Sequence, residues 1–164
     1  MTIRFNPREL LTVAIQIERN GEAYYTRMAA HVKEPGIKKI MEALAVAEKQ
    51  HISDFQKIEA GLVQPDYDIP EDYQTPEMEG YLRSLADGKV FSNLLPVEEI
   101  AAEIRTDIDA IRHAISFEKD SIIFFNEIYD LLPENEPNRR AVAELIRQEK
   151  IHIAQLYALM GSRR

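Results

Sequence analysis

Two Glu-x-x-His pairs interrupt apolar helical seams in this sequence, and they constrain the fold more than any other feature. Residues three apart on a helix leave from one face, so each pair points in one direction. Both pairs stand where the alternating 3–4 spacing of apolar residues predicts a buried face. The seams read Ile37, Met41, Leu44, Glu48, His51, Phe55, Ile58 and Leu62, and Val142, Leu145, Glu149, His152, Leu156 and Leu159.

Two further seams carry a glutamate at their centre. A buried, unpaired carboxylate costs several kcal/mol, so each such glutamate predicts a positive partner. Four inward glutamates and two inward histidines therefore predict a metal site, and crowding them together predicts raised carboxylate pKa values. The seams read Leu11, Ile15, Glu18, Glu22, Tyr25, Ala29 and Val32, and Ile104, Ile108, Ile111, Ile115, Glu118, Ile122, Phe125, Tyr129 and Leu132.

Glu22 and Tyr25 share the seam of Glu18 and are secondary candidates for the site. Each could be an extra ligand or could contact the ligands. For Tyr25 the alternative is a core aromatic residue whose hydroxyl is hydrogen-bonded elsewhere. For any one of the glutamates or histidines alone, burial without metal is also a reasonable interpretation.

The periodicity and the capping residues predict four long helices in one domain over residues 1–164. Proline and aspartate between the second and third helices predict a long crossover with one short helix over 76–86. A disordered linker is the alternative, but Tyr67, Tyr73, Tyr81 and Leu82 favour packing on the bundle. The long helices are expected over 7–33, 36–60, 96–132 and 137–160, the third with a break near Thr106 and Asp107.

The two halves of the chain resemble copies of one helical hairpin. Glu18 and Glu118 are 100 positions apart, and each is followed by a Glu-x-x-His pair, 30 or 31 positions later. Tyr24-Tyr25 in the first half corresponds to Phe124-Phe125 in the second. Two hairpins joined by a long crossover make an all-α four-helix bundle of one known connectivity.

Composition excludes several classes of function. The net charge is −8 and the pI about 5.1, which argues against nucleic acid and anionic membranes as partners. The sequence has no cysteine, so disulfides, thiolate metal sites and a cysteine nucleophile are excluded. No apolar run has the length of a signal peptide's core or a membrane span, and we expect a cytoplasmic protein.

The sequence resembles the rubrerythrin-like branch of the ferritin-like di-iron superfamily. The resemblance lies in Ala47-Glu48-Lys49-Gln50-His51 and Gln148-Glu149-Lys150-Ile151-His152, in Phe117-Glu118-Lys119-Asp120-Ser121, and in Glu18 with Tyr25. It implies a ferritin-like four-helix bundle holding two iron ions, with manganese as the alternative metal. By this resemblance Glu48 and Glu149 bridge the ions, Glu18 and His51 complete one shell, and Glu118 and His152 complete the other.

Two departures from the family bear on activity. The rubredoxin module that supplies electrons in rubrerythrins needs four cysteines, so here an external electron-donor protein is expected. Ser121 stands where rubrerythrins carry a second glutamate that takes part in redox-linked ligand exchange, and Glu22 is the candidate to replace it.

The resemblance implies an oxidoreductase that reduces hydrogen peroxide or oxidises Fe²⁺, that is, a peroxidase or a ferroxidase. The alternatives are an iron-binding carrier, storage or sensor protein without turnover, and a bundle whose site is vestigial. We also expect a homodimer, because apolar residues outside the seams could form a contact surface. These residues are Tyr24, Ile52, Ile123 and Phe124.

Overall fold

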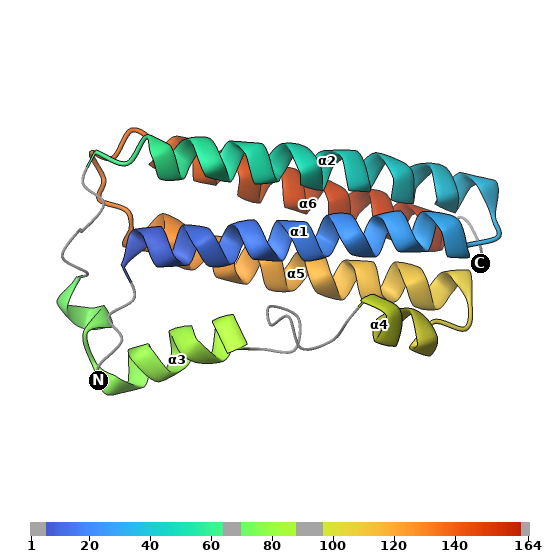
Figure 1. The fold of residues 1–164 in the computed structure, drawn as a ribbon, viewed down its shortest axis with the longest axis horizontal. Helices are drawn as coiled ribbons and strands as arrows, with labels where there is room; N and C mark the ends of the chain where they lie inside the picture. The colour runs from blue at the N-terminus through green and yellow to red at the C-terminus, as the bar shows by residue number, and fades with distance from the viewer. Residues whose placement is uncertain (1–5, 64–69, 88–96, 162–164) are drawn as a thin grey trace.

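Four long helices form an antiparallel bundle in the computed structural model, which describes residues 6–63, 70–87 and 97–161 (Figure 1). Consecutive helices pair as two hairpins, as the sequence predicts, and the long crossover joins them. The bundle helices are α1 (Pro7–His31), α2 (Pro35–Ala60), α5 (Asp107–Leu131) and α6 (Arg139–Gly161).

Polar caps fix where the bundle helices begin. Asn6 and Glu9 form a capping box at the start of α1, and Thr106 and Asp109 form another at the start of α5. Both boxes satisfy backbone N–H groups that the first turn leaves unpaired. The capping box at Thr106 also explains why the third expected helix is divided, with α4 (Val97–Glu103) ending before it.

The crossover packs on the bundle, as the aromatic residues predict. Besides α4 it contains the 3₁₀ turn η1 (Glu71–Tyr73) and α3 (Pro76–Asp87). Tyr73 and Tyr81 donate hydrogen bonds to the Glu127 carboxylate on α5, at 3.2 and 2.7 Å, and Leu82 is buried. Tyr67 lies outside the described residues.

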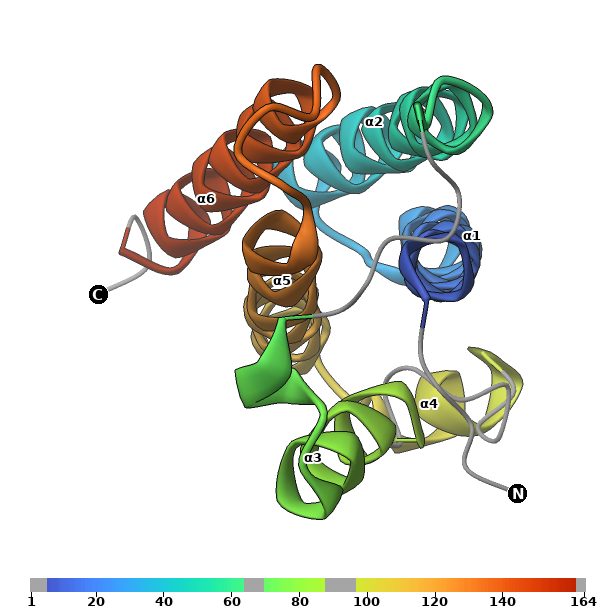
Figure 2. The ribbon, with the colours of Figure 1, turned by 90° about the vertical axis from the view of Figure 1, so that its left-hand side faces the viewer.

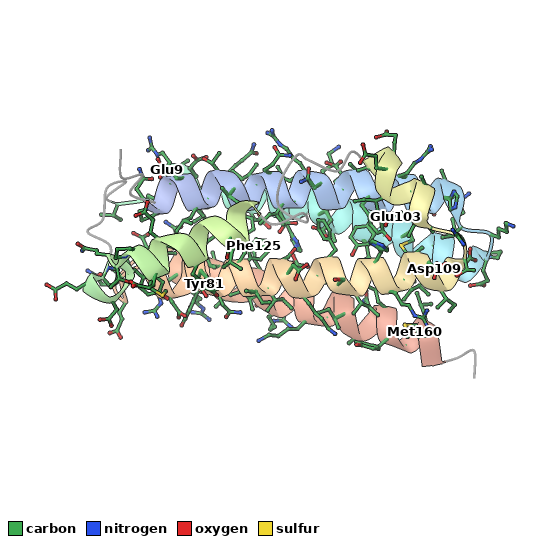
Figure 3. All side chains as sticks on the ribbon, turned by 90° about the horizontal axis from the view of Figure 1, so that it is seen from below. Glu9, Tyr81, Glu103, Asp109, Phe125 and Met160 are labelled. Carbon is green, nitrogen blue, oxygen red and sulfur yellow. The ribbon has the colours of Figure 1, made fainter. Side chains whose placement is uncertain are left out.

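The crossover helices cover one side of the bundle. They lie on the side of α1 and α5 that faces away from α2 and α6 (Figure 2). Seen from this side, α3 and α4 cover opposite ends of the α1 and α5 pair (Figure 3). None of the described helices is long and apolar enough to cross a membrane.

Two of the residues predicted to form a dimer contact are buried inside the protein, so the prediction is wrong for them. Tyr24 and Phe124 are only 2% and 0% exposed, so neither is available at the surface. Leu82 of α3 shares a core cluster with Phe124, and Ala101 of α4 shares one with Tyr24, so the crossover covers faces that the four-helix pattern leaves open. Ile123 is exposed, and the homodimer stays a prediction.

Candidate metal centre

Six side chains from four helices converge in the middle of the bundle. Their exposed fractions range from 0% to 8%, and apolar clusters lie toward both ends of the bundle. They form two groups, in each of which the candidate ligand atoms lie within 4.8 Å of one another. The first group is Glu18, Glu48, His51 and Glu149, and the second group is Glu48, Glu118, Glu149 and His152.

A glycine in the middle of α1 makes room for one shared carboxylate. A Cβ atom on Gly21 would lie 3.2 Å from Glu48 Oε2 and 3.1 Å from a ring carbon of Phe117. Glycine inside a helix costs about 1 kcal/mol relative to alanine. Here it lets the α1 backbone approach the cluster, a role that the sequence pattern did not reveal.

Both histidines turn the same ring nitrogen toward the carboxylates. His51 Nδ1 lies 2.9 Å from Glu149 Oε1 and 3.5 Å from Glu18 Oε2. His152 Nδ1 lies 2.8 Å from Glu149 Oε2 and 3.6 Å from Glu118 Oε1. Glu149 therefore stands between the two imidazole rings, whose centroids are 5.4 Å apart.

Two neighbours contact the cluster from outside. The Tyr25 hydroxyl donates a hydrogen bond to Glu118 Oε1, so Tyr25 is a core residue that contacts a candidate ligand. Gln148 Oε1 lies 2.9 Å from His51 Nε2. The sequence pattern did not identify Gln148 as a contact of the site. Its position directly before Glu149 was a signal, because a side chain at that position can reach the opposite helix.

Glu22 and Ser121, at which the sequence varies from the rubrerythrin-like pattern, lie apart from this arrangement. Glu22 is half-buried, and neither group includes it. Ser121 is buried, and its hydroxyl donates a hydrogen bond to the Phe117 carbonyl in its own helix, at 3.1 Å. The position that carries the second glutamate in rubrerythrins thus presents no charge to the cluster.

The pKa values of the four carboxylates shift in different directions. Burial raises the pKa of Glu18 to about 7, and it raises those of Glu48 and Glu118 well above 4.5. Burial also acts to raise the pKa of Glu149, but the nearby His152 and His51 outweigh it and lower that pKa. The expectation that all four pKa values rise is therefore wrong for Glu149.

The histidines respond to the same contacts. Burial opposes a charged imidazole, but carboxylates raise the pKa of His152 to about 10, chiefly Glu118 and Glu149. The pKa of His51 is raised still further, first by Glu149. Without metal, Glu149 therefore acts as the anion that balances two imidazolium rings.

Several buried polar atoms of the cluster have no hydrogen bond among the described residues. They are Glu18 Oε1, Glu48 Oε1, His51 Nδ1 and Glu149 Oε1. His51 Nδ1 is close to Glu149 Oε1 but off the hydrogen-bonding direction. Buried polar atoms in proteins nearly always have a partner, so these fit a centre that binds cations. Carboxylate and imidazole ligands without thiolate suit iron or manganese.

Comparison with known proteins agrees with this geometry. The rubrerythrin family model matches residues 9–160. A crystal structure at 2.30 Å resolution of a Thermotoga maritima protein, provisionally described as a ferritin-like diiron-carboxylate protein, is 27% identical, with a TM-score of 0.66. The match covers 94% of each chain, which confirms the predicted ferritin-like bundle. No curated protein matches the chain.

Proposed function

The chain belongs to the rubrerythrin family, and we propose that it is a di-iron oxidoreductase that acts on hydrogen peroxide or oxidises Fe²⁺. The observation that carries this proposal is the pair of buried ligand groups that share two glutamates. Two divalent ions carry four positive charges, which four carboxylates would balance. In a buried core, neither the ions nor the ionised carboxylates would be stable without the other.

Each group would hold one ion. Glu18 and His51 would complete the shell of one, Glu118 and His152 would complete the shell of the other, and the shared carboxylates Glu48 and Glu149 would bridge them. When bound, two iron ions would supply redox chemistry that glutamate and histidine lack, by cycling between the Fe²⁺ and Fe³⁺ states. Manganese satisfies the same ligand chemistry.

The burial of the site limits the substrate to a small molecule or ion. The most exposed of the six residues is His152, at 8%, and the others are at most 2% exposed. Hydrogen peroxide, O₂ and Fe²⁺ are small enough to enter such a site. The apolar residues on both sides exclude bulk water, which would otherwise screen the charges of the ligands.

The proton on Tyr25 is positioned at the second group. Burial raises the pKa of Tyr25 well above 10, and neighbouring carboxylates raise it further, so the phenol stays protonated and donates to Glu118. It would thereby orient Glu118 toward an ion. Electrons for repeated turnover would come from another protein, because the chain has no cysteine with which to hold an iron–sulfur donor.

Anaerobic loading with two equivalents of Fe²⁺, followed by stopped-flow mixing with hydrogen peroxide or O₂, tests the proposal. We expect oxidation much faster than that of free Fe²⁺, and little acceleration in Glu118→Gln. Glu42→Gln, which removes an exposed carboxylate on α2, should behave as the wild type. Tight binding of two ions with no acceleration would instead favour a carrier or sensor protein.

A further inference from the structure

We propose that the two metal positions are unequal, and that the first group binds its ion before the second group and more tightly. Gln148 acts at the first group as a positioning residue, through His51. This inference rests on the proposed function, and it concerns the order in which the two positions fill. Three features of the structure support it.

The first feature is the hydrogen bond from His51 to Gln148. With Gln148 Oε1 2.9 Å away, the Nε2 atom of His51 carries the proton and donates it. When an ion displaces the proton on Nδ1, the proton held on Nε2 keeps the ring in the tautomer whose Nδ1 lone pair faces the carboxylates, where the ion would bind. The ring is thus held in the tautomer and orientation that a ligand needs.

The amide of Gln148 is itself held in the required orientation. Its Nε2 atom donates to Glu144 Oε1 at 3.3 Å. Arg147 in turn donates two hydrogen bonds to the Glu144 carboxylate, at 2.9 and 2.6 Å. With the amide nitrogen directed at a carboxylate, the amide oxygen faces His51.

The second feature is that the other half of the chain lacks this support. The residue equivalent to Gln148, directly before Glu48, is Ala47, and its methyl group can accept no hydrogen bond. No residue in the described part of the chain hydrogen-bonds His152 Nε2. Among the described residues, the His152 ring is held by a hydrogen bond only at Nδ1, on the side where an ion would bind.

The third feature is the distribution of unsatisfied atoms. Three of the cluster's buried atoms without a hydrogen bond among the described residues belong to the first group: Glu18 Oε1, His51 Nδ1 and Glu149 Oε1. The fourth, Glu48 Oε1, lies on the side of His152, in the second group. In the second group, Glu149 Oε2 is hydrogen-bonded to His152 Nδ1 at 2.8 Å. An ion entering the first group displaces the His51–Glu149 ion pair, which is not a well-directed hydrogen bond. An ion entering the second group must break the hydrogen bond between Glu149 and His152.

Calorimetric titration of the metal-free protein with Mn²⁺, under anaerobic conditions, tests the order of binding. We expect two events with dissociation constants at least about tenfold apart. Replacing a residue that orients a metal ligand typically lowers affinity 10- to 100-fold. Gln148→Leu should therefore weaken the tighter event by roughly that factor and leave the weaker one nearly unchanged.

Matched variants separate positioning from folding. Gln148→Glu keeps an acceptor for His51 Nε2–H and should retain the tight event. Gln155→Leu makes the same substitution at an exposed position two turns later on α6, and should bind as the wild type does. Loss of the tight event in Gln155→Leu, or the same loss in Gln148→Glu as in Gln148→Leu, would contradict the role of Gln148.

Two histidine variants assign the events to the groups, even if Gln148→Leu does not fold. His152→Ala should retain one tightly bound ion, and His51→Ala should lose it. Two equal events in the wild type, or a tight ion retained in His51→Ala and lost in His152→Ala, would contradict the inference and leave the proposed function standing. Absence of any binding would contradict the proposed function itself.

Discussion

Tyr25 on α1 donates its hydroxyl hydrogen to the carboxylate of Glu118 on α5, across 93 positions of sequence. The residue equivalent to Tyr25 in the second half of the chain is Phe125, which has no hydroxyl group. The hydrogen bond therefore exists on one side of the pseudo-symmetric centre. The bundle is built from two similar hairpins, but the surroundings of its two ligand groups differ.

Tyr25→Phe should weaken both the fold and the second group. With metal bound Glu118 would be charged, and a hydrogen bond to a charged group contributes about 2 kcal/mol, so we expect thermal unfolding of the metal-bound variant to begin several degrees lower. The ion held by Glu118 should bind about tenfold more weakly, because its carboxylate loses an orienting partner. Calorimetric titration and thermal denaturation measure the two effects.

The neighbouring tyrosine provides the control for that prediction. Tyr24 donates its hydroxyl hydrogen to the Ala110 carbonyl oxygen, at 2.7 Å, and touches none of the six candidate ligands by hydrogen bond. Tyr24→Phe should lower stability by about 1 kcal/mol and leave metal affinity unchanged. If both variants lowered metal affinity equally, the contact between Tyr25 and Glu118 would have no specific role.

The six cluster residues could be predicted because helical periodicity decides which side chains face the core. Periodicity does not predict the register between the helices, nor which faces of the bundle α3 and α4 cover. The role of Gln148 and the lowered pKa of Glu149 depend on which atoms meet across α2 and α6. Tyr24 and Phe124 are buried in the clusters that also contain residues of the crossover helices. The apolar seams of the four long helices do not predict where these crossover helices pack.

Gly21→Ala should behave unlike an ordinary glycine substitution. Alanine normally stabilises a helix by about 1 kcal/mol relative to glycine. At position 21 the added methyl group would press on Glu48 and Phe117, so that gain should vanish and metal affinity should fall. Gly80 on α3 has no atom within 4 Å of such a methyl group, and Gly80→Ala should show the full gain. Titration and unfolding curves of both variants decide the matter.

Glu18→Gln and Glu149→Gln should differ when metal is removed. Burial raises the pKa of Glu18, so a neutral amide there should leave the chelator-treated protein as stable or slightly more stable. Glu149 balances His51 and His152, and its loss should cost about 3 kcal/mol, as for breaking a buried ion pair.

With metal bound, both variants should lose stability relative to the wild type, because each removes a ligand charge. Thermal unfolding with chelator and with Mn²⁺ gives all the values needed. Equal destabilisation by the two variants in chelator would mean that Glu149 has no special part in balancing the histidines.

The stability of the metal-free protein should fall as the pH rises from 4.5 to about 7. Burial raises the Glu18 pKa from 4.5 to about 7, so the folded protein keeps a proton that the unfolded chain releases. The stability contributed by that proton is complete below pH 4.5 and is lost as the pH rises through 7. The raised pKa values of Glu48 and Glu118 act in the same direction.

The stabilisation that metal adds should depend on pH in the opposite direction, because ligands bind an ion only when they are deprotonated. The increase in melting temperature on adding Mn²⁺ should therefore be larger at pH 7 than at pH 5. Melting curves with chelator and with metal across this interval test both statements. A chelator-treated protein that became more stable between pH 5 and pH 7 would contradict the assignment of raised carboxylate pKa values.

Anomalous diffraction from crystals grown with excess Fe²⁺ or Mn²⁺ is the most direct test of the metal centre. We expect two peaks per chain, about 3.5–4 Å apart, with the carboxylates of Glu48 and Glu149 between them. His51 Nδ1 should lie within bonding distance of one peak and His152 Nδ1 of the other. Peaks located elsewhere, or none in the middle of the bundle despite saturating metal, would contradict a di-metal centre formed by these six residues.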